Sequence, residues 1–366
     1  MLALTTTSIA WIILAAIVIG WFAYAISNLR SGKVEAGSEL ELAANRKPYH
    51  DDSELEGRHL ELVQMLGVVL LIVVVIGLPL YWVFEPARQS GATESAENRL
   101  VGWGADLFET TANGGFNCAG CHGGMNGTGG AAEYSITDSK TQEVKAVSWK
   151  APAVNTVFYR YSEDEVRFIL VYGRPFSPMS AWGIEGGGPM NSQQIDSLIA
   201  YLKSIQLEPA DCAEGETPVD IDVGRIIEDE VVTICPSGQL PAEKREEIEN
   251  AARQSVDDGT YASYGEALFN LELDSGAFSC ARCHTQGWSY DDPGVPGQGA
   301  FGWNLRGGAT NSHFPNQAEM EEFVAAGSEV GAVYGIQGQG SGRMPGFGAM
   351  LTDEQIEEVV EYVRGL

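Results

Sequence analysis

The sequence is poor in positive charge and in histidine. Against 50 Asp and Glu residues it has only 22 Lys and Arg residues, which gives a formal net charge of −28, and it has 5 His residues. So acidic a chain lacks the basic surface that nucleic-acid binding requires. An acidic surface suits a basic protein partner instead, because complementary charges steer encounter. A surface adapted to salt or to solubility is the alternative interpretation.

Positive charge is missing altogether from the first 29 residues. Residues 8–27 are apolar and long enough to cross a bilayer. A secretory signal peptide has a basic region before a shorter apolar core, so we expect residues 8–27 to be a retained membrane anchor. A second apolar run covers residues 62–84, with Tyr81 and Trp82 placed as interfacial aromatics.

The loop between the two apolar runs, residues 28–60, carries most of the positive charge of this region. Under the positive-inside rule this loop is cytoplasmic, and both termini lie outside the plasma membrane. Residues 1–90 are therefore predicted to form a two-span transmembrane hairpin in the lipid bilayer. One span is enough for anchoring, so we also expect contact with other membrane subunits. Neither span has a His inside its apolar run, which excludes a b-type haem held between them.

Four of the six cysteines occur in two pentapeptides of one pattern, Cys118-Ala119-Gly120-Cys121-His122 and Cys280-Ala281-Arg282-Cys283-His284. C-x-x-C-H is the attachment signature of c-type haem. The two thiols add across the haem vinyl groups, and the His becomes the proximal iron ligand. The pattern predicts two covalently bound haem c groups. A structural zinc site needs four ligands, whereas each cluster offers three. The sequence also lacks the Cys-x-x-x-Cys ligands of a CuA-type copper site.

The other two cysteines, Cys212 and Cys235, lie in an acidic linker predicted over residues 208–258. This type of haem attachment takes place outside the cytoplasm, where disulfides also persist. We therefore predict a Cys212–Cys235 disulfide, with two unrelated buried thiols as the alternative. Partial alternation predicts a small hairpin over 218–234, and residues 241–255 are predicted to be a polar helix that acts as a solvated spacer.

A methionine follows each C-x-x-C-H motif at a similar distance, Met179 after the first and Met344 after the second. A thioether suits haem iron, and Met/His ligation raises the reduction potential. We predict Met179 and Met344 to be the distal iron ligands. Met190 and Met125 are the alternatives for the first haem, and His313 is the alternative for the second.

The features around the two motifs repeat along the chain, which predicts an internal duplication with domains at 96–207 and 259–366. Before the motifs, residues 103–108 (WGADLF) match residues 264–269 (YGEALF). An acidic linker containing GATESAEN precedes a helix predicted over 98–111, and further helices are predicted over 163–173 and 316–327. Each domain is predicted to end in an amphipathic helix. The first has Asn191 or Ser192 as its N-cap, with Ile195, Leu198, Ile199 and Leu202 on one face; the second has a Thr352–Gln355 capping box, with Ile356, Val359, Val360 and Val363.

C-x-x-C-H followed by R-M-P-x-F at 343–347 and a terminal amphipathic helix resembles class I cytochrome c. The resemblance covers both repeated units and implies all-α domains whose first and last helices cross, with one haem edge exposed. It implies the ligand pairs His122 with Met179 and His284 with Met344. The first unit departs from the pattern, because Pro178 precedes its Met and residues 186–188 (GGG) lengthen the following loop.

A membrane anchor followed by two haem domains is similar to the dihaem subunits of cbb3-type oxidases and to the cytochrome cc subunit of bcc-type reductases, although the latter anchors at its C-terminus. This resemblance implies an electron carrier without catalytic residues of its own. It would pass single electrons outside the membrane between a quinol-oxidising or donor module and a mobile cytochrome c or terminal oxidase. The alternative is a haem enzyme, such as a dihaem peroxidase or the cytochrome subunit of a dehydrogenase. A peroxidase needs an open iron position with acid–base groups beside it.

Overall fold

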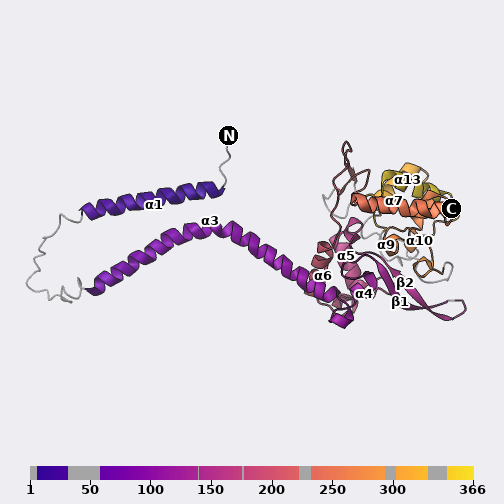
Figure 1. Ribbon diagram of the computed structural model, residues 1–366, viewed down its shortest axis with the longest axis horizontal. Helices are drawn as coiled ribbons and strands as arrows, with labels where there is room; N and C mark the ends of the chain where they lie inside the picture. Colours follow the sequence, from indigo (N-terminus) through magenta and orange to yellow (C-terminus); the bar gives the residue numbers. More distant parts are fainter. Residues whose placement is uncertain are drawn as a thin grey trace, which may run out of the picture. The chain divides into compact units, whose positions relative to one another are not determined.

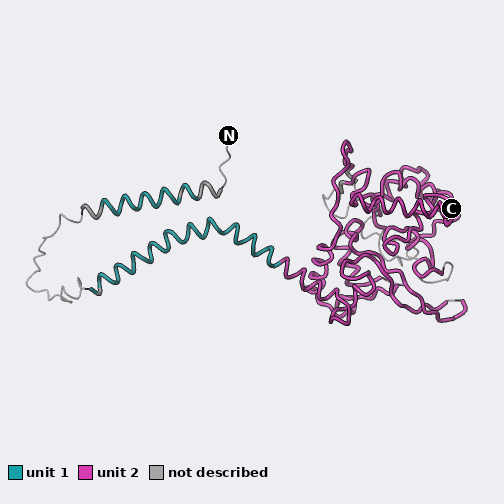
Figure 2. The backbone as a smooth tube through the Cα atoms, viewed as in Figure 1, with its two compact units in different colours: residues 1–96 teal, residues 97–366 magenta. Residues whose placement is uncertain are grey.

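A computed structural model describes residues 6–31, 58–138, 140–174, 177–221, 232–292, 302–328 and 344–366 of the chain. The chain divides into two compact units, Met1–Ala96 and Glu97–Leu366 (Figure 2). The described residues of unit 1 are helical, whereas unit 2 contains both C-x-x-C-H motifs together with helices and short strands (Figure 1).

Unit 1 contains helix α1 (Thr6–Ser31) and most of helix α3 (Arg58–Phe108). The helical stretch Leu60–Phe108 is long enough to cross a membrane and contains an apolar 18-residue segment with a mean hydropathy of 2.7, and Leu14–Ser27 form a shorter apolar helix. The two helices touch where the rings of Trp11 and Phe84 meet at 6.5 Å between centroids. Most of the loop predicted over 28–60 lies outside the described residues.

The acidic segment that contains GATESAEN (91–98), which was predicted to be a linker, is helical, and the boundary between the two units falls within it, after Ala96. Helix α3 runs through it without a break and ends at Phe108. Ala, Glu and Arg are strong helix formers. Just before this segment, an ion pair between Arg88 and Glu85, one turn apart at 2.5 Å, further stabilises the helix. The end of the second apolar run and the first helix of the predicted haem domain are therefore one element.

The first half of unit 2 places two capped helices against the end of α3. Helix α5 (Glu163–Tyr172) begins with a capping box between Ser162 and Glu165, and helix α6 (Ser192–Ser204) begins with one between Asn191 and Gln194. These helices confirm the predictions for 163–173 and for the amphipathic helix that follows Asn191. Their apolar faces join α3 in one core that includes Phe108, Val166, Met190, Ile195, Leu198, Ile199 and Leu202.

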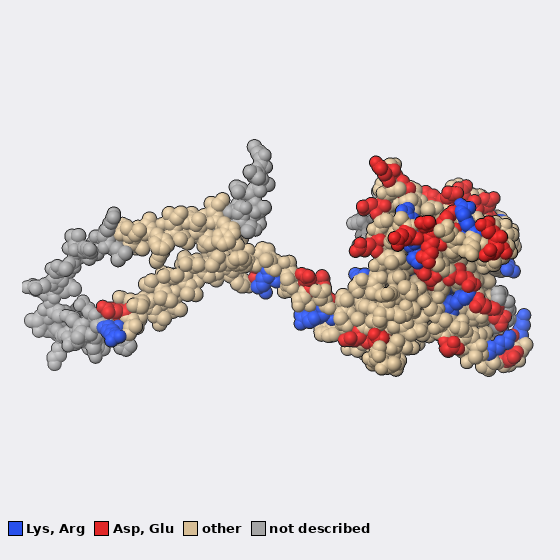
Figure 3. Space-filling model, viewed as in Figure 1, with Lys and Arg blue, Asp and Glu red and all other residues tan. Residues whose placement is uncertain are grey.

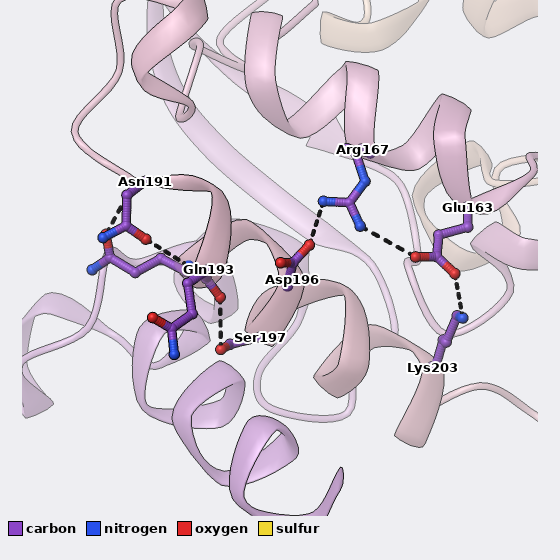
Figure 4. Close-up of polar contacts among 8 residues, drawn as sticks. Glu163, Arg167, Asn191, Gln193, Asp196, Ser197 and Lys203 are labelled. Atoms are coloured by element: carbon purple, nitrogen blue, oxygen red, sulfur yellow. Dashed lines mark hydrogen bonds and ion pairs between the residues drawn. The ribbon is translucent and has the colours of Figure 1, made fainter. Parts of the chain in front are cut away.

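Ion pairs on the surface also connect α5 with α6 (Figure 4). Arg167 lies between Glu163, at 3.2 Å, and Asp196 of α6, at 2.5 Å, and Glu163 also pairs with Lys203 at 2.5 Å. In the same view Ser197 donates a hydrogen bond to the carbonyl of Gln193 in the first turn of α6. The charged groups extend the α5–α6 contact beyond the apolar core.

The predicted all-α class is too narrow, because the described residues are mostly helical but unit 2 also contains strands. Strands β1 (Gly130–Thr137) and β2 (Val144–Ala151) form an antiparallel hairpin after the first motif, with Gly130 opposite Ala151 and Thr137 opposite Val144. Its side chains Ile136 and Trp149 are buried against Tyr290, which follows the second motif. The hairpin's apolar face is thus covered by a residue far away in the sequence, and local patterning gives no sign of that.

The segment between the two motif regions contains a second small hairpin and a disulfide. Strands β3 (Val219–Ile221) and β4 (Val232–Ile234) pair antiparallel, and Cys212 is joined to Cys235 with an S–S distance of 2.00 Å. Helix α7 (Ala242–Asp257) follows. It is not a solvated spacer as predicted, because Ile248 and Ala252, one turn apart, are fully buried in the core of the second half.

The second half of unit 2 repeats the helical plan of the first. Helix α8 (Tyr264–Phe269) packs against the last helix, α13 (Asp353–Arg364), and α12 (Gln317–Ala326) packs against α13 as well. The predicted capping box of α13 is present: Gln355 N–H donates to the Thr352 hydroxyl at 3.2 Å and Thr352 N–H donates to the Gln355 side chain at 3.1 Å. Further short α-helices among the described residues are α4 (Cys118–His122), α9 (Leu273–Gly276), α10 (Ala281–His284) and α11 (Ala309–His313).

Candidate haem sites

Each C-x-x-C-H motif forms about one turn of helix, α4 in the first half and α10 in the second. Residues three and four apart lie on the same face of a helix, so the two thiols and the imidazole of one motif point the same way. Cys118, Cys121 and His122 all line one cavity. Their counterparts in the second motif, Cys280, Cys283 and His284, all line another.

None of the four motif cysteines takes part in a disulfide. Burial raises the pKa of Cys118 to about 11 and the pKa of Cys280 to about 12. At neutral pH these side chains are therefore uncharged and fit an apolar wall without an ionic partner. They have the form that a thioether bond to a vinyl group requires, a thiol next to a space that can hold the group.

The two motif histidines make the same hydrogen bond. Nδ1 of His122 lies 2.8 Å from the carbonyl oxygen of Pro152, and Nδ1 of His284 lies 2.8 Å from the carbonyl oxygen of Trp303. A carbonyl can only accept, so Nδ1 carries the proton and Nε2 keeps its lone pair. Burial lowers the pKa of both imidazoles, which keeps them neutral. A neutral imidazole oriented through its other nitrogen is the usual form of a metal-binding His.

The structure brings each predicted His–Met pair to one cavity. Met179 lines the first cavity together with His122, and Met344 lines the second together with His284. Among the described residues that line the first cavity, Met179 is the one methionine. Met190 is fully buried in the helical core, and Met125 packs against the edge of the same core.

The second cavity contains two further side chains with possible ligand atoms. His313 lines it, with its ring tilted against that of Trp303 at 5.5 Å and edge-on to that of Phe314 at 4.6 Å. Met320, on the buried face of α12, lines it as well. The sequence analysis missed Met320, because a Met at a buried helical position has the pattern of an ordinary core residue.

Met179 and Met344 occupy equivalent positions in the two halves. Helices α5 and α12 both end at a glycine, and the residue after that glycine donates its N–H to the carbonyl of the methionine. These bonds are Arg174 to Met179 at 2.8 Å and Ser328 to Met344 at 3.0 Å. Each methionine N–H in turn donates to a nearby serine hydroxyl, at 3.2 Å in the first half and 2.9 Å in the second. The same backbone arrangement thus presents a thioether to each cavity.

Both cavities suit a large planar apolar group. Each has about 1430 Å³ of empty space that continues into open solvent, and apolar side chains make up most of its lining. Two thiols, an imidazole with a free Nε2 and a thioether together make the donor set of a c-type haem. Three arginines, Arg160, Arg174 and Arg282, also line both cavities; the sequence analysis did not identify them as functional.

Comparisons with known proteins agree with this donor set. The family described as "Cytochrome c" matches residues 103–206, and the family described as "Cytochrome C oxidase, cbb3-type, subunit III" matches residues 265–363. Each match contains one C-x-x-C-H motif and the methionine that follows it. No curated protein and no solved structure matches the chain.

Proposed function

The chain is a c-type cytochrome with two class I haem domains, and we propose that it relays single electrons between two covalently bound haem c groups on the outer face of a plasma membrane. In this proposal it is a subunit of a respiratory complex and stands between a quinol-oxidising or other donor module and a mobile cytochrome or terminal oxidase. The two cytochrome c domains already indicate electron transfer by a haem protein. The place within a respiratory complex is the additional step that we propose.

One observation carries the proposal: each cavity has a His and a Met from the same half of unit 2. Haem, when bound, supplies one-electron redox chemistry at its iron. The imidazoles of His122 and His284, oriented by the carbonyls of Pro152 and Trp303, would each be one protein ligand of a haem iron. The thioethers of Met179 and Met344 would be the second protein ligands. With two ligands supplied by the protein, nothing else would need to bind the iron, which favours electron transfer over catalysis at the metal.

The surface of unit 1 supports membrane attachment. Apolar side chains of α3 between residues 62 and 84 are exposed along its length, for example Leu62 at 53% and Leu78 at 64%. Figure 3 shows few charged residues on the visible surface of the described parts of α1 and of this stretch of α3. Such a surface in water costs about 25 cal/mol for each Å², so lipid or other membrane subunits are its expected neighbours.

The contact between Trp11 and Phe84 supports the proposed orientation. It joins the beginning of α1 to the end of the apolar run of α3, so both ends would lie on one side of the bilayer. The basic residues between the two runs would then lie on the cytoplasmic side. Haem attachment to the C-terminal domains requires the outer side, and the two lines of argument agree.

The acidic surface of unit 2 supports a basic redox partner. Asp and Glu side chains gather over the region of α7 and α13 (Figure 3). Helix α13 alone contributes Asp353, Glu354, Glu357, Glu358 and Glu361. Charge of one sign on one face raises the rate of encounter with a partner of opposite sign and makes it depend on ionic strength.

The proposal is tested by redox-titrated visible spectra of the detergent-purified protein, with and without carbon monoxide. Two low-spin haems that do not bind carbon monoxide are expected. Met179→Ala and Met344→Ala should each open one iron position, make one haem bind carbon monoxide and lower its reduction potential. Met190→Leu, a volume-conserving change in the core, is the control and should do neither. Carbon monoxide binding by the unmodified protein would contradict the relay and favour a haem enzyme.

A further inference from the structure

The two haem cavities meet at a common wall. Five residues line both of them: Arg160, Tyr161, Arg174, Arg282 and Cys283. Two of these arginines come from the first half, where Arg160 follows the short helix at Val157–Tyr159 and Arg174 follows α5. Arg282 comes from the second half, between the two cysteines of the second motif. The wall is therefore built by both haem domains.

The three arginines concentrate positive charge in a chain that is otherwise strongly acidic. Arg160 is buried, with 8% of its surface exposed. The guanidinium groups of Arg160 and Arg174 both lie over the ring of Tyr161, at 5.7 and 5.3 Å from its centroid. One aromatic side chain thus positions two cations at the common wall.

Arg282 is held in the wall from the other side by backbone carbonyls. Its guanidinium donates to the carbonyl of Lys150 at 2.8 Å, to that of Gly276 at 3.2 Å and to that of Ser275. The carbonyls orient the group but carry no negative charge, and partly buried cations of one sign repel one another. An anion between them would remove that cost.

We propose that Arg160, Arg174 and Arg282 form one anion site shared by the two cavities, and that its ligands are carboxylates, at least one from the contents of each cavity. This inference rests on the proposed function, because the carboxylates that reach the site from inside a haem cavity are the haem propionates. A free anion from solution has the same chemistry and is the other source to be distinguished.

A shared site has a consequence that two separate sites lack. Each guanidinium acts on the charge of both haem irons, since all three groups line both cavities. Positive charge beside an iron favours its reduced form, so the loss of one guanidinium should lower the potentials of both haems. If the two domains had separate sites, the loss of one arginine would change the reduction potential of one haem only.

The test measures both haem potentials in variants of the full-length, detergent-purified protein. Arg282→Gln and Arg160→Gln should each shift the oxidised-to-reduced ratio of both haems by up to about tenfold, which is about 59 mV for a one-electron couple. Arg282→Lys keeps the charge and should restore most of the shift. Arg167→Gln removes an exposed arginine of α5 that already pairs with Glu163 and Asp196, and it should change neither potential. Haem content and circular dichroism check that each variant folds.

A shift confined to one haem, or no shift at all, would overturn the shared site and leave the relay function standing. Fewer than two haems in the unmodified protein would contradict the proposed function, and this inference with it. Exchange of chloride for phosphate at constant ionic strength distinguishes haem propionates from an anion taken up from solution. Potentials that do not respond to this exchange support the propionates, whereas potentials that respond in the unmodified protein but not in Arg282→Gln would show a solution anion and overturn the assignment to the haems.

Discussion

Gly104 of α3 lies so close to Ser197 of α6 that a Cβ atom on Gly104 would be 1.9 Å from the Ser197 carbonyl oxygen. The second haem domain repeats this contact, since a Cβ on Gly265 of α8 would be 2.1 Å from the carbonyl oxygen of Glu358 in α13. Both glycines are the second residue of the repeated WGADLF and YGEALF segments. The first and last helices of each domain thus approach closely at a glycine.

Gly104→Ala and Gly265→Ala are therefore expected to destabilise the protein, each by about 1–3 kcal/mol, because the backbone atoms in the way cannot move aside without separating the helices. Gly102→Ala is the matched control, since it lies on the same helix with nothing within 4 Å of the added methyl group. It should be neutral or stabilising by up to about 1 kcal/mol. Chemical denaturation followed by circular dichroism measures the three changes, and equal effects of Gly102→Ala and Gly104→Ala would contradict the close contact.

Trp149 links the β1–β2 hairpin to the second haem domain. It is buried with Ile136 and Tyr290, and its ring lies 4.9 Å from that of Tyr290. The neighbouring Lys150 adds ion pairs to Glu272 and Asp291 across the same contact. We expect Trp149→Ala to cost about 3–5 kcal/mol and to let the two haem domains unfold separately in calorimetry.

Tyr134→Ala is the control for this variant. Tyr134 packs edge-on against Trp149 from the hairpin itself, and 37% of its surface is exposed. Tyr134→Ala should weaken the hairpin without separating the unfolding transitions of the two haem domains. If Trp149→Ala keeps the calorimetric profile of Tyr134→Ala, the hairpin does not couple the two domains.

The grouping of two thiols and one imidazole in each motif could be predicted from the sequence because local spacing determines it. Three residues of C-x-x-C-H share one helical turn, and the capping box at Thr352 and Gln355 fixes the start of α13 from four consecutive residues. The methionines follow because the domain repeats. These features need no knowledge of what packs against them.

The features that could not be predicted depend on contacts between distant segments. The alternation in β1 and β2 acquires a buried face only from Tyr290, and α7 becomes part of a core only because Ile248 meets the second haem domain. The wall common to the two cavities depends even more on contacts between distant segments. Arg160 and Arg282 are more than a hundred positions apart in the sequence, and neither has a functional pattern until the two cavities are seen to meet.

The Cys212–Cys235 disulfide should stabilise the second haem domain. Cys235 is buried, and the segment after it contacts the beginning of α13, where Asp353 N–H donates to the Pro236 carbonyl at 2.9 Å. With 23 residues of sequence separation, the chain-entropy account gives about 3–4 kcal/mol. The double variant Cys212→Ser, Cys235→Ser should lose this amount in chemical denaturation, and mild reduction of the unmodified protein should match it. A loss below about 1 kcal/mol would mean that the noncovalent contacts of the segment hold it without the bond.

The ion pairs between α5 and α6 predict a pH dependence of stability in the acid range. The hydrogen bond from Lys203, and then that from Arg167, hold the pKa of Glu163 below its ordinary value of 4.5. A carboxyl whose pKa is lower in the folded state stabilises the protein above the pKa of the unfolded chain, and this contribution is lost as the pH falls through the folded-state pKa. Because the Glu163 side chain is 43% exposed, solvent screening limits the contribution to about 0.5–1 kcal/mol.

Glu163→Gln should therefore lower the free energy of unfolding by about 0.5–1 kcal/mol at pH 7, and the difference from the unmodified protein should vanish once the pH is well below 4.5. Asp164→Asn is the control, because it removes a carboxylate from the same first turn of α5. Among the described residues Asp164 has no ion pair, so its replacement reports only the interaction of a charge with the helix terminus. Urea denaturation across the acid range measures both variants. Equal losses from the two would assign the effect of Glu163 to the helix terminus and not to Lys203 and Arg167.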